Sequence, residues 1–315
     1  MIARGQTHRN RAARPSWRTV AVGAGQVLLT AAILWVVVAL WGPENFTSAL
    51  RGLPWWTFAV AGVLGGAGVV TQAARWRIVA RHHGIDIGVG AAVARCWQAA
   101  FLNSVLPGGI AGDALRAADD STDAEASSRR GALARGFAAM ATERLVGSAV
   151  VFTAGGAVLL PLAPLAGIGC LTAALVAVLI ATRWLRRLPW AAIVQVVLLS
   201  VLGWMCFASL FMVSVAVLAP SAPVTVMPSS AAVALAGMSV PVGVGGWGIR
   251  EVAAAWSFSL NGLASDAGVR VSVGYGVLAL ASTAPGAAIL SLRLMPRLRG
   301  ARRFVSRSRT GSSHR

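Results

Sequence analysis

The sequence predicts an all-α integral membrane protein, with about six full transmembrane helices and two re-entrant segments of broken helix related as an inverted repeat. Three observations lead to this prediction. Hydrophobic residues make up 57% of the 315 positions and charged residues only 12%, too few to cover a soluble globule. Uncharged runs of roughly 20 residues, enough to cross a bilayer, alternate with short arginine-rich loops. Two further apolar segments are interrupted by proline and glycine near their middle.

The net charge of +18 does not indicate a nucleic-acid-binding protein. No lysine is present, and the arginines cluster in the tails and in short loops between apolar runs. This is the positive-inside pattern of membrane proteins, and it predicts no nucleic-acid partner. The three cysteines lie singly in apolar stretches and the four histidines in basic segments. No disulfide framework, metal site or cofactor is therefore expected.

The first predicted crossing, 20–41, is an uncharged run that follows a basic tail, 1–18. The positive-inside rule places its start in the cytoplasm, and its bulky C-terminal end distinguishes it from a cleaved signal peptide. The second crossing, 55–74, returns to the cytoplasmic side. Three arginines are expected at the cytoplasmic interface that follows: Arg75, Arg77 and Arg81.

Four more crossings follow at 137–160, 162–182, 190–218 and 271–292. Prolines separate 137–160 from 162–182, and arginines separate 162–182 from 190–218, as expected of short interfacial loops. The count of crossings places both termini in the cytoplasm, in a multi-pass protein of the cell membrane. The expected organisation is a basic tail at 1–18, a transmembrane domain at 19–293 and a second basic tail at 294–315.

The two broken segments are 89–116 and 229–260. Treating either as one straight crossing would break the charge topology. Irregular backbone at membrane depth is tolerated only where it is buried in protein or lines a wet cavity, so each segment is expected to be a re-entrant hairpin. The topology predicts that the first enters from the cytoplasm and the second from outside.

A motif recurs in the two broken segments at identical offsets: Pro107, Gly109, Gly112 and Arg116, then Pro241, Gly243, Gly246 and Arg250. Gly108, Gly245 and Gly248 add to the same breaks. Because three crossings separate the copies, the copies run in opposite orientations. This is the inverted-repeat plan of secondary transporters, in which such breaks mark the transport site.

Arg116 and Arg250 are predicted to bind phosphate. A charge at the centre of a membrane helix costs about 2.5–3.5 kcal/mol on insertion scales, and arginine suits a bidentate contact with phosphate. The alternative is that both arginines reach an interface, where that cost nearly vanishes. Asp113 and Glu251, beside them in the sequence, would hold the arginines or receive a cationic headgroup.

Glu143 and Arg144 are adjacent charges inside a predicted crossing. Helical neighbours point about 100° apart, so each is expected to reach another element, with Arg116 and Asp113 as candidate partners. The alternative is a salt bridge that only fixes helix packing. Asn103 either adds polarity to a wet cavity at the first break or caps that break.

Four motifs follow one another along the chain: Arg75-Trp76, then Asn103 with Leu106-Pro107-Gly108-Gly109, Gly112-Asp113 and Arg116, then Glu143-Arg144, then Gly245-Gly246-Trp247-Gly248-Ile249-Arg250-Glu251. In this order and spacing they resemble the lysylphosphatidylglycerol synthase membrane-region family of flippase-like proteins. The resemblance covers nearly the whole chain. One departure is Ala111, where the family often has a second glycine before the aspartate.

The resemblance implies a bundle with re-entrant helices that moves a lipid between leaflets, such as an aminoacylated phospholipid or a polyprenyl-linked glycolipid. Larger members carry a soluble aminoacyl transferase domain after the membrane region. In this chain only the arginine-rich tail follows the last crossing, so lysyl transfer from tRNA is not expected.

The resulting hypothesis is a lipid flippase and not an enzyme, which moves an anionic or aminoacylated phospholipid or a polyprenyl-linked lipid. The two breaks would line a groove that binds the lipid phosphate. The alternative is a membrane accessory subunit, or an enzyme that acts on lipid-linked substrates with a partner transferase. No complete catalytic set is visible in the sequence. The expected partners are membrane lipids, with a transferase and a homo-oligomer left open.

Overall fold

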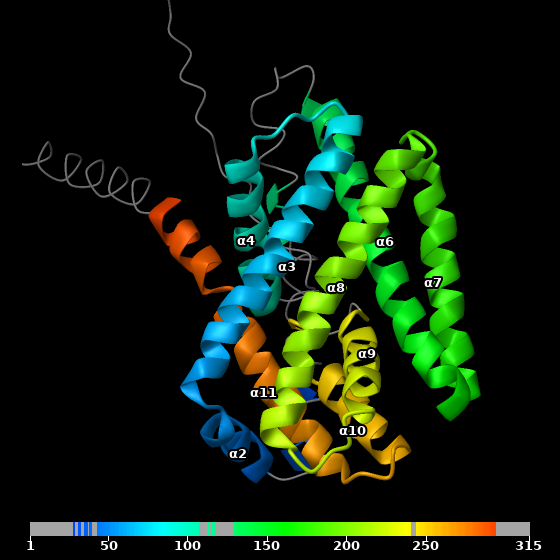
Figure 1. Cartoon of the computed structure of the whole chain (residues 1–315). Coiled ribbons are helices and arrows are strands. Elements are labelled where there is room, and N and C mark those ends of the chain that lie inside the picture. Colours follow the sequence, from blue (N-terminus) through cyan, green and yellow to red (C-terminus); the bar gives the residue numbers. More distant parts are fainter. Residues whose placement is uncertain are drawn as a thin grey trace, which may run out of the picture.

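The computed structural model describes residues 43–106, 112–113, 115–116, 129–240 and 244–293, with scattered positions between 28 and 39. The described residues are helical apart from short connections, which confirms the predicted all-α class (Figure 1). The helices are α2 (Glu44–Gly52), α3 (Trp55–His82), α4 (Val89–Val105), α6 (Arg129–Leu162), α7 (Pro164–Leu185), α8 (Trp190–Leu218), α9 (Val226–Met238), α10 (Ile249–Leu260) and α11 (Ser265–Ser282).

Within the described part of the chain, five helices are long and apolar enough to cross a membrane. They are Trp55–His82, Ala134–Leu162, Pro164–Leu185, Trp190–Leu218 and Ser265–Arg293. These five agree with five of the six predicted crossings. The sixth, 20–41, and both predicted tails lie wholly or mostly outside the described residues.

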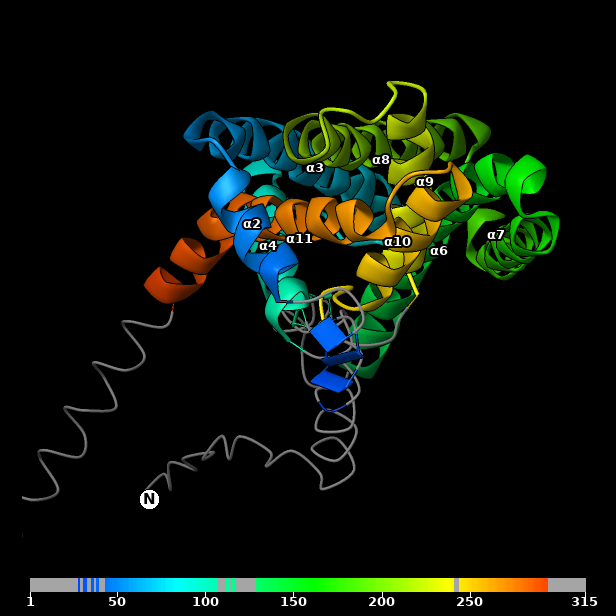
Figure 2. The same ribbon diagram turned by 90° about the horizontal axis from the view of Figure 1, so that it is seen from below.

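Helix α7 shows the kind of surface that these spans present. It lies at the edge of the bundle beside α6 (Figures 1 and 2). Its outward side exposes large apolar side chains: Leu165, Ile168, Leu175 and Leu179. Such a surface would be unfavourable in water and suits contact with lipid chains.

Helix α3 is longer than the predicted crossing, because it ends at His82 and not near residue 74. Trp76, Val79 and Ala80 are buried, so the helix continues to pack against its neighbours beyond the predicted end. Arg75 therefore lies inside the bundle and not at the membrane interface where the sequence placed it. Its side chain is only 14% exposed.

The last span also differs from its prediction. It begins at Ser265, six residues before the predicted start at 271, and a turn at Thr283 interrupts it. The ribbon bends beyond α11 (Figure 1). Asp266 lies in the first turn, where a negative charge is favourable, and Arg270 donates a hydrogen bond to the carbonyl of Leu218. Pro285 explains the bend, because proline has no backbone N–H to donate and its ring disturbs the preceding turn.

The two broken segments contain helices that do not run the full height of the bundle. Helix α4 begins at the end where α3 finishes, whereas α9 and α10 lie side by side at the opposite end (Figure 1). Helices α9 and α10 have 13 and 12 residues, about 20 and 18 Å at the α-helical rise, which is less than the roughly 30 Å of a hydrocarbon core. The two-fold relation between the segments stays a prediction.

Glycine backbone makes the second break. Gly245, Gly246 and Gly248 have φ values of +56°, +77° and +88°, a region that side chains with a Cβ rarely adopt. The carboxylate of Glu251 accepts a hydrogen bond of 2.5 Å from the Gly248 N–H and so caps the start of α10. Of the other predicted break residues, Gly112 is described, whereas Pro107, Gly108, Gly109, Pro241 and Gly243 lie outside the described residues.

The two broken segments meet inside the protein. A Cβ placed on Gly245 would lie 2.5 Å from the carbonyl oxygen of Ser104, near the end of α4. The backbone of the second break is therefore in close contact with the last turn of the first segment, at a distance that only glycine permits.

Candidate functional site

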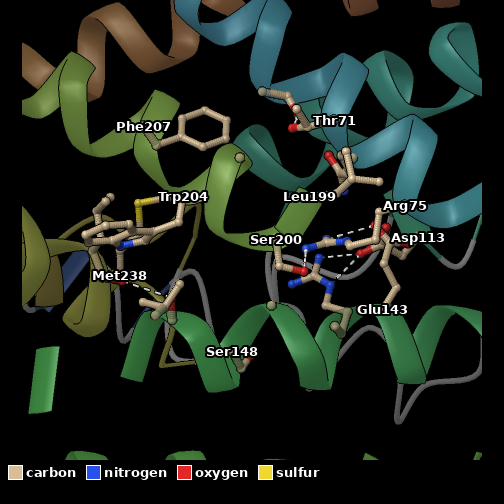
Figure 3. A pocket seen from close by; sticks show the side chains of 18 of the residues that line it. Thr71, Arg75, Asp113, Glu143, Ser148, Leu199, Ser200, Trp204, Phe207 and Met238 are labelled. Atoms are coloured by element: carbon tan, nitrogen blue, oxygen red, sulfur yellow. Dashed lines mark hydrogen bonds and ion pairs between the residues drawn. The ribbon is translucent and has the colours of Figure 1, made fainter. Parts of the chain in front are cut away.

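A cavity of about 300 Å³ lies between α3, α6, α8 and the C-terminal end of α9. At one side of the view in Figure 3 are the charged residues Arg75, Asp113 and Glu143, and Ser200 lies near the middle. At the other side are Trp204, Phe207 and Met238. The cavity thus joins a charged end to an end with large apolar and aromatic walls.

Glu143 of α6 is the centre of a buried ion-pair network at the charged end. Its Oε1 accepts a hydrogen bond from Arg75 Nη2 at 3.0 Å, and its Oε2 accepts one from Arg116 Nη2 at 2.7 Å. The side chains of Glu143 and Arg116 are only 1% and 2% exposed. Arg75 also donates to Ser200 Oγ at 2.9 Å, so this one arginine connects α3, α6 and α8.

Asp113 is the second carboxylate of the network. Its Oδ2 accepts hydrogen bonds from Arg144, through Nε at 2.7 Å and through Nη2. Its Oδ1 lies 3.2 Å from Arg116 Nη2, an ion-pair distance without hydrogen-bond geometry. Asn103 donates to Asp113 Oδ2 at 3.2 Å and accepts from the Gly112 N–H at 2.8 Å. Asn103 therefore caps the first break, which was one of its two predicted roles.

The prediction that Glu143 and Arg144 each reach another element, with Arg116 and Asp113 as partners, is confirmed, because Glu143 pairs with Arg116 and Arg144 pairs with Asp113. Among the described residues that line the cavity, three arginines face two carboxylates, an excess of one positive charge. Arg144 is the most accessible of the three arginines, with 45% of its side chain exposed.

Arg250 and Glu251 form a second buried ion pair, with Arg250 Nη2 at 2.6 Å from Glu251 Oε1. Ser272 of α11 donates to the same carboxylate oxygen and accepts from Arg250 Nε, both at 3.0 Å. The guanidinium also lies over two rings, 4.7 Å from the centroid of Trp247 and 5.3 Å from that of Tyr275.

The two arginines of the repeated motif have similar surroundings. Arg116 pairs with Glu143 and lies 4.6 Å above the ring of Trp76, as Arg250 pairs with Glu251 above Trp247. Both arginines are almost completely buried, so neither snorkels to an interface.

The cavity does not take in every predicted site residue. Of these residues, Asp113, Arg116, Glu143 and Arg144 line it, whereas Asn103, Arg250 and Glu251 do not. Tyr275 lies between the two ion-pair clusters, because it lines the cavity and its ring also faces Arg250. The second cluster therefore supports the cavity wall through Tyr275.

Some residues of the cavity were missed by the sequence reasoning. Arg75 was placed at the interface, although its position in a resemblance motif beside Trp76 was an available signal. Ser200, Trp204 and Tyr275 lie in uniformly apolar runs, where hydropathy does not distinguish a cavity-facing side chain from a lipid-facing one. Among the described residues, no three His, Cys, Asp or Glu side chains gather closely enough to hold a metal ion.

Gly276 of α11 leaves the space that the Arg250 guanidinium and the Trp247 ring occupy. A Cβ at Gly276 would collide with the Arg250 guanidinium and come within 2.9 Å of the Trp247 ring. Because Arg250 is held by Glu251, we expect Gly276→Ala to lower the free energy of unfolding by about 1–3 kcal/mol, measured by thermal or chemical denaturation in detergent.

Gly62→Ala is the matched control, since Gly62 lies in helix α3 and a Cβ there meets nothing within 4 Å. Alanine at Gly62 should be neutral or slightly stabilising, by up to about 1 kcal/mol. Equal stabilities for the two variants would contradict the packing role of Gly276.

Comparison with known families gives a match to the model described as the lysylphosphatidylglycerol synthase TM region, over residues 23–191. The match covers more than half of the chain and includes the Glu143 network, whereas Arg250 and Glu251 lie beyond it. A search of curated proteins finds none that matches.

Proposed function

Because this chain belongs to the lysylphosphatidylglycerol synthase transmembrane-region family, we propose that it is a lipid translocator that moves an anionic or aminoacylated phospholipid or a polyprenyl-linked lipid between bilayer leaflets. The family and the five apolar spans make the chain a multi-pass membrane protein of a lipid-related family. Translocation itself is the proposal. The observation that carries it is the cavity, which joins a cationic network to apolar walls inside the bundle.

The cavity offers the two environments that a lipid needs when its headgroup leaves the interface. The excess positive charge at Arg75 and Arg144 would bind the phosphate through charge-assisted hydrogen bonds. Phe207, Leu199 and Val151 offer an apolar wall to the adjoining part of the lipid. The carboxylates would hold the arginines in place, which is one of the two roles that the sequence suggested for them.

Alternating exposure of this cavity would use the two broken segments as re-entrant elements. On the positive-inside rule, the end with Arg81, Arg183 and Arg187 is cytoplasmic, so α4 would enter from the cytoplasm and α9 with α10 from outside. Their contact at Ser104 and Gly245 would then be the point at which one segment moves against the other. Both termini would be cytoplasmic.

Arg144→Gln tests the function with little risk to the fold, because Asp113 keeps Arg116 and Asn103 as neighbours. The substitution removes the excess positive charge. We expect the initial rate of transbilayer movement of fluorescent phosphatidylglycerol in proteoliposomes to fall about ten-fold or more, the scale of one charge-assisted hydrogen bond.

Arg183→Gln is the matched control, because this exposed arginine lies in the last turn of α7 and does not line the cavity. Its rate should equal that of the unmodified protein. An unchanged rate in Arg144→Gln, or no movement of any lipid by the folded unmodified protein, would argue against the proposal. Alanine variants of Arg116 or Arg250 are less informative, because each leaves a buried carboxylate without its main partner.

We also propose that the chain is not itself an enzyme. Each carboxylate that lines the cavity is paired with an arginine, an arrangement that favours charge binding over proton transfer. A role as the accessory subunit of a partner transferase would be favoured instead if a transferase co-purified with the chain and its product formed only in the presence of both.

A further inference from the structure

The unpaired polar atoms of the cavity indicate what kind of headgroup it binds, given the proposed translocator function. Besides Asp113 Oδ1, which lies 3.2 Å from Arg116 Nη2, three buried polar atoms on residues that line the cavity have no hydrogen-bond partner among the described residues: Arg75 Nε, Trp204 Nε1 and Tyr275 Oη. The side chain of Tyr275 is completely buried. A buried donor without an acceptor is unfavourable, so these groups point to a ligand that completes them.

The chemistry of these three groups restricts the ligand. The N–H groups of Arg75 and Trp204 can only donate hydrogen bonds, whereas the Tyr275 hydroxyl can donate or accept. The ligand must therefore supply acceptor oxygens both at the charged end and near Trp204, which Figure 3 places at the other side of the view. An ammonium group offers only donors, so it could pair with Asp113 Oδ1 or the Tyr275 hydroxyl but would leave the N–H groups of Arg75 and Trp204 without acceptors. It would also add a positive charge where, among the described lining residues, positive charge is already in excess.

We propose that the cavity selects a lipid whose headgroup is a singly charged phosphodiester bearing uncharged hydroxyl groups, such as a glycerol or one sugar, and rejects headgroups that end in an ammonium group. The phosphate faces Arg75 and Arg144, which balances the excess positive charge. The hydroxyl oxygens of the headgroup accept hydrogen bonds from Trp204 and Tyr275. This choice excludes the aminoacylated lipids from the broader set of proposed substrates.

Size supports the same class of headgroup. A volume of about 300 Å³ is at the lower end of the range for small-molecule sites, so it accommodates one compact headgroup and not an oligosaccharide. Trp204, Phe207 and Met238 bound the space at the side of the view opposite Arg75 (Figure 3).

Binding to the purified full chain in detergent tests this inference without requiring transport. Four probes are titrated by calorimetry: dihexanoylphosphatidylglycerol, dihexanoylphosphatidylmethanol, dihexanoylphosphatidylethanolamine and glycerol 1-phosphate. Phosphatidylmethanol has the same charge as phosphatidylglycerol but no hydroxyl group, so it should bind about five-fold to ten-fold more weakly. Phosphatidylethanolamine, with its ammonium group, should bind at least about ten-fold more weakly. Glycerol 1-phosphate should be the weakest, because it lacks the apolar part.

Tyr275→Phe tests the hydroxyl contact directly. It removes one unpaired atom and keeps the ring that packs against Phe211 and Arg250, so the fold should be retained. The preference for phosphatidylglycerol over phosphatidylmethanol should fall to about two-fold or less, with the affinity for phosphatidylmethanol unchanged. Trp204→Phe should weaken the same preference, whereas Trp190→Phe, at an exposed tryptophan of α8, should not.

Several results would overturn the inference. Equal affinities for phosphatidylglycerol and phosphatidylmethanol, or for phosphatidylglycerol and phosphatidylethanolamine, would remove the selectivity. Binding of glycerol 1-phosphate as tight as that of phosphatidylglycerol would assign the site to a soluble phosphate ester. The proposed function is tested separately in liposomes. Selective binding without lipid movement would contradict the translocator function and leave the headgroup inference standing. Movement of all lipids at similar rates would support the translocator function and contradict the headgroup inference.

Discussion

Replacing Glu143 with alanine will lower the free energy of unfolding by about 3–5 kcal/mol, the largest effect of any single substitution in the cavity wall. Glu143 is the shared partner of Arg75 and Arg116, and it is almost completely buried. Its removal leaves Arg116, which is almost completely buried, with the more distant Asp113 as its only charged neighbour among the residues that the structure describes. The measurement is denaturation in detergent, combined with the fraction of monodisperse protein after purification.

Two control variants test whether the loss of stability depends on the charge and the buried position of Glu143. Glu143→Gln keeps one acceptor oxygen, which can serve only one of the two arginines, and loses the charge, so its stability should lie between those of the unmodified protein and the alanine variant. Glu44→Ala, at an exposed position in α2, should change stability by less than about 0.5 kcal/mol. If Glu143→Ala were as stable as Glu44→Ala, the network would not support the fold.

Replacing Arg250 with methionine will have an effect of similar size, about 3–5 kcal/mol of destabilisation. The substitution keeps most of the side-chain volume beneath Trp247 and Tyr275 but leaves Glu251 charged and fully buried. The remaining partners of that carboxylate are Ser272 and the Gly248 N–H, which are both neutral. The free energy of unfolding again provides the measurement.

A double substitution separates charge from shape at this cluster. In Arg250→Met with Glu251→Gln, the glutamine side chain can still accept from the Gly248 N–H, and no unpaired charge remains. We expect most of the lost stability to return, whereas Arg51→Met, at an exposed position in α2, should have almost no effect. A double variant no more stable than Arg250→Met would show that the guanidinium contributes by more than neutralising Glu251.

These expectations give the two ion-pair clusters different tasks. The Arg250 cluster is closed, because its charges satisfy each other beside the break at Gly248. The Glu143 network is open toward the cavity, where the described lining residues carry one positive charge in excess and Arg144 is partly exposed. The Arg250 cluster would stabilise the fold at the second break, and the Glu143 network would bind the ligand.

Much of this architecture could be predicted from the sequence, because the bilayer requires long apolar helices and leaves a strong signal in hydropathy and arginine placement. The span at Trp190–Leu218 agrees with its predicted bounds, and the break between α9 and α10 lies within the predicted segment 229–260. The different partners of Glu143 and Arg144 were also predictable, since adjacent helical residues point in different directions.

The sequence by itself thus determined the class of the protein, five of its spans in the described part of the chain, and which charges needed partners. Only the tertiary structure decided which side chains share the cavity. A hydropathy pattern records how apolar a helix is but not which side of it faces protein, so Trp204 and Tyr275 resembled lipid-facing residues. The predicted position of Arg75 was wrong because its charge suggested a membrane interface. An ion pair with Glu143, 68 positions away in the chain, instead allows Arg75 to be buried.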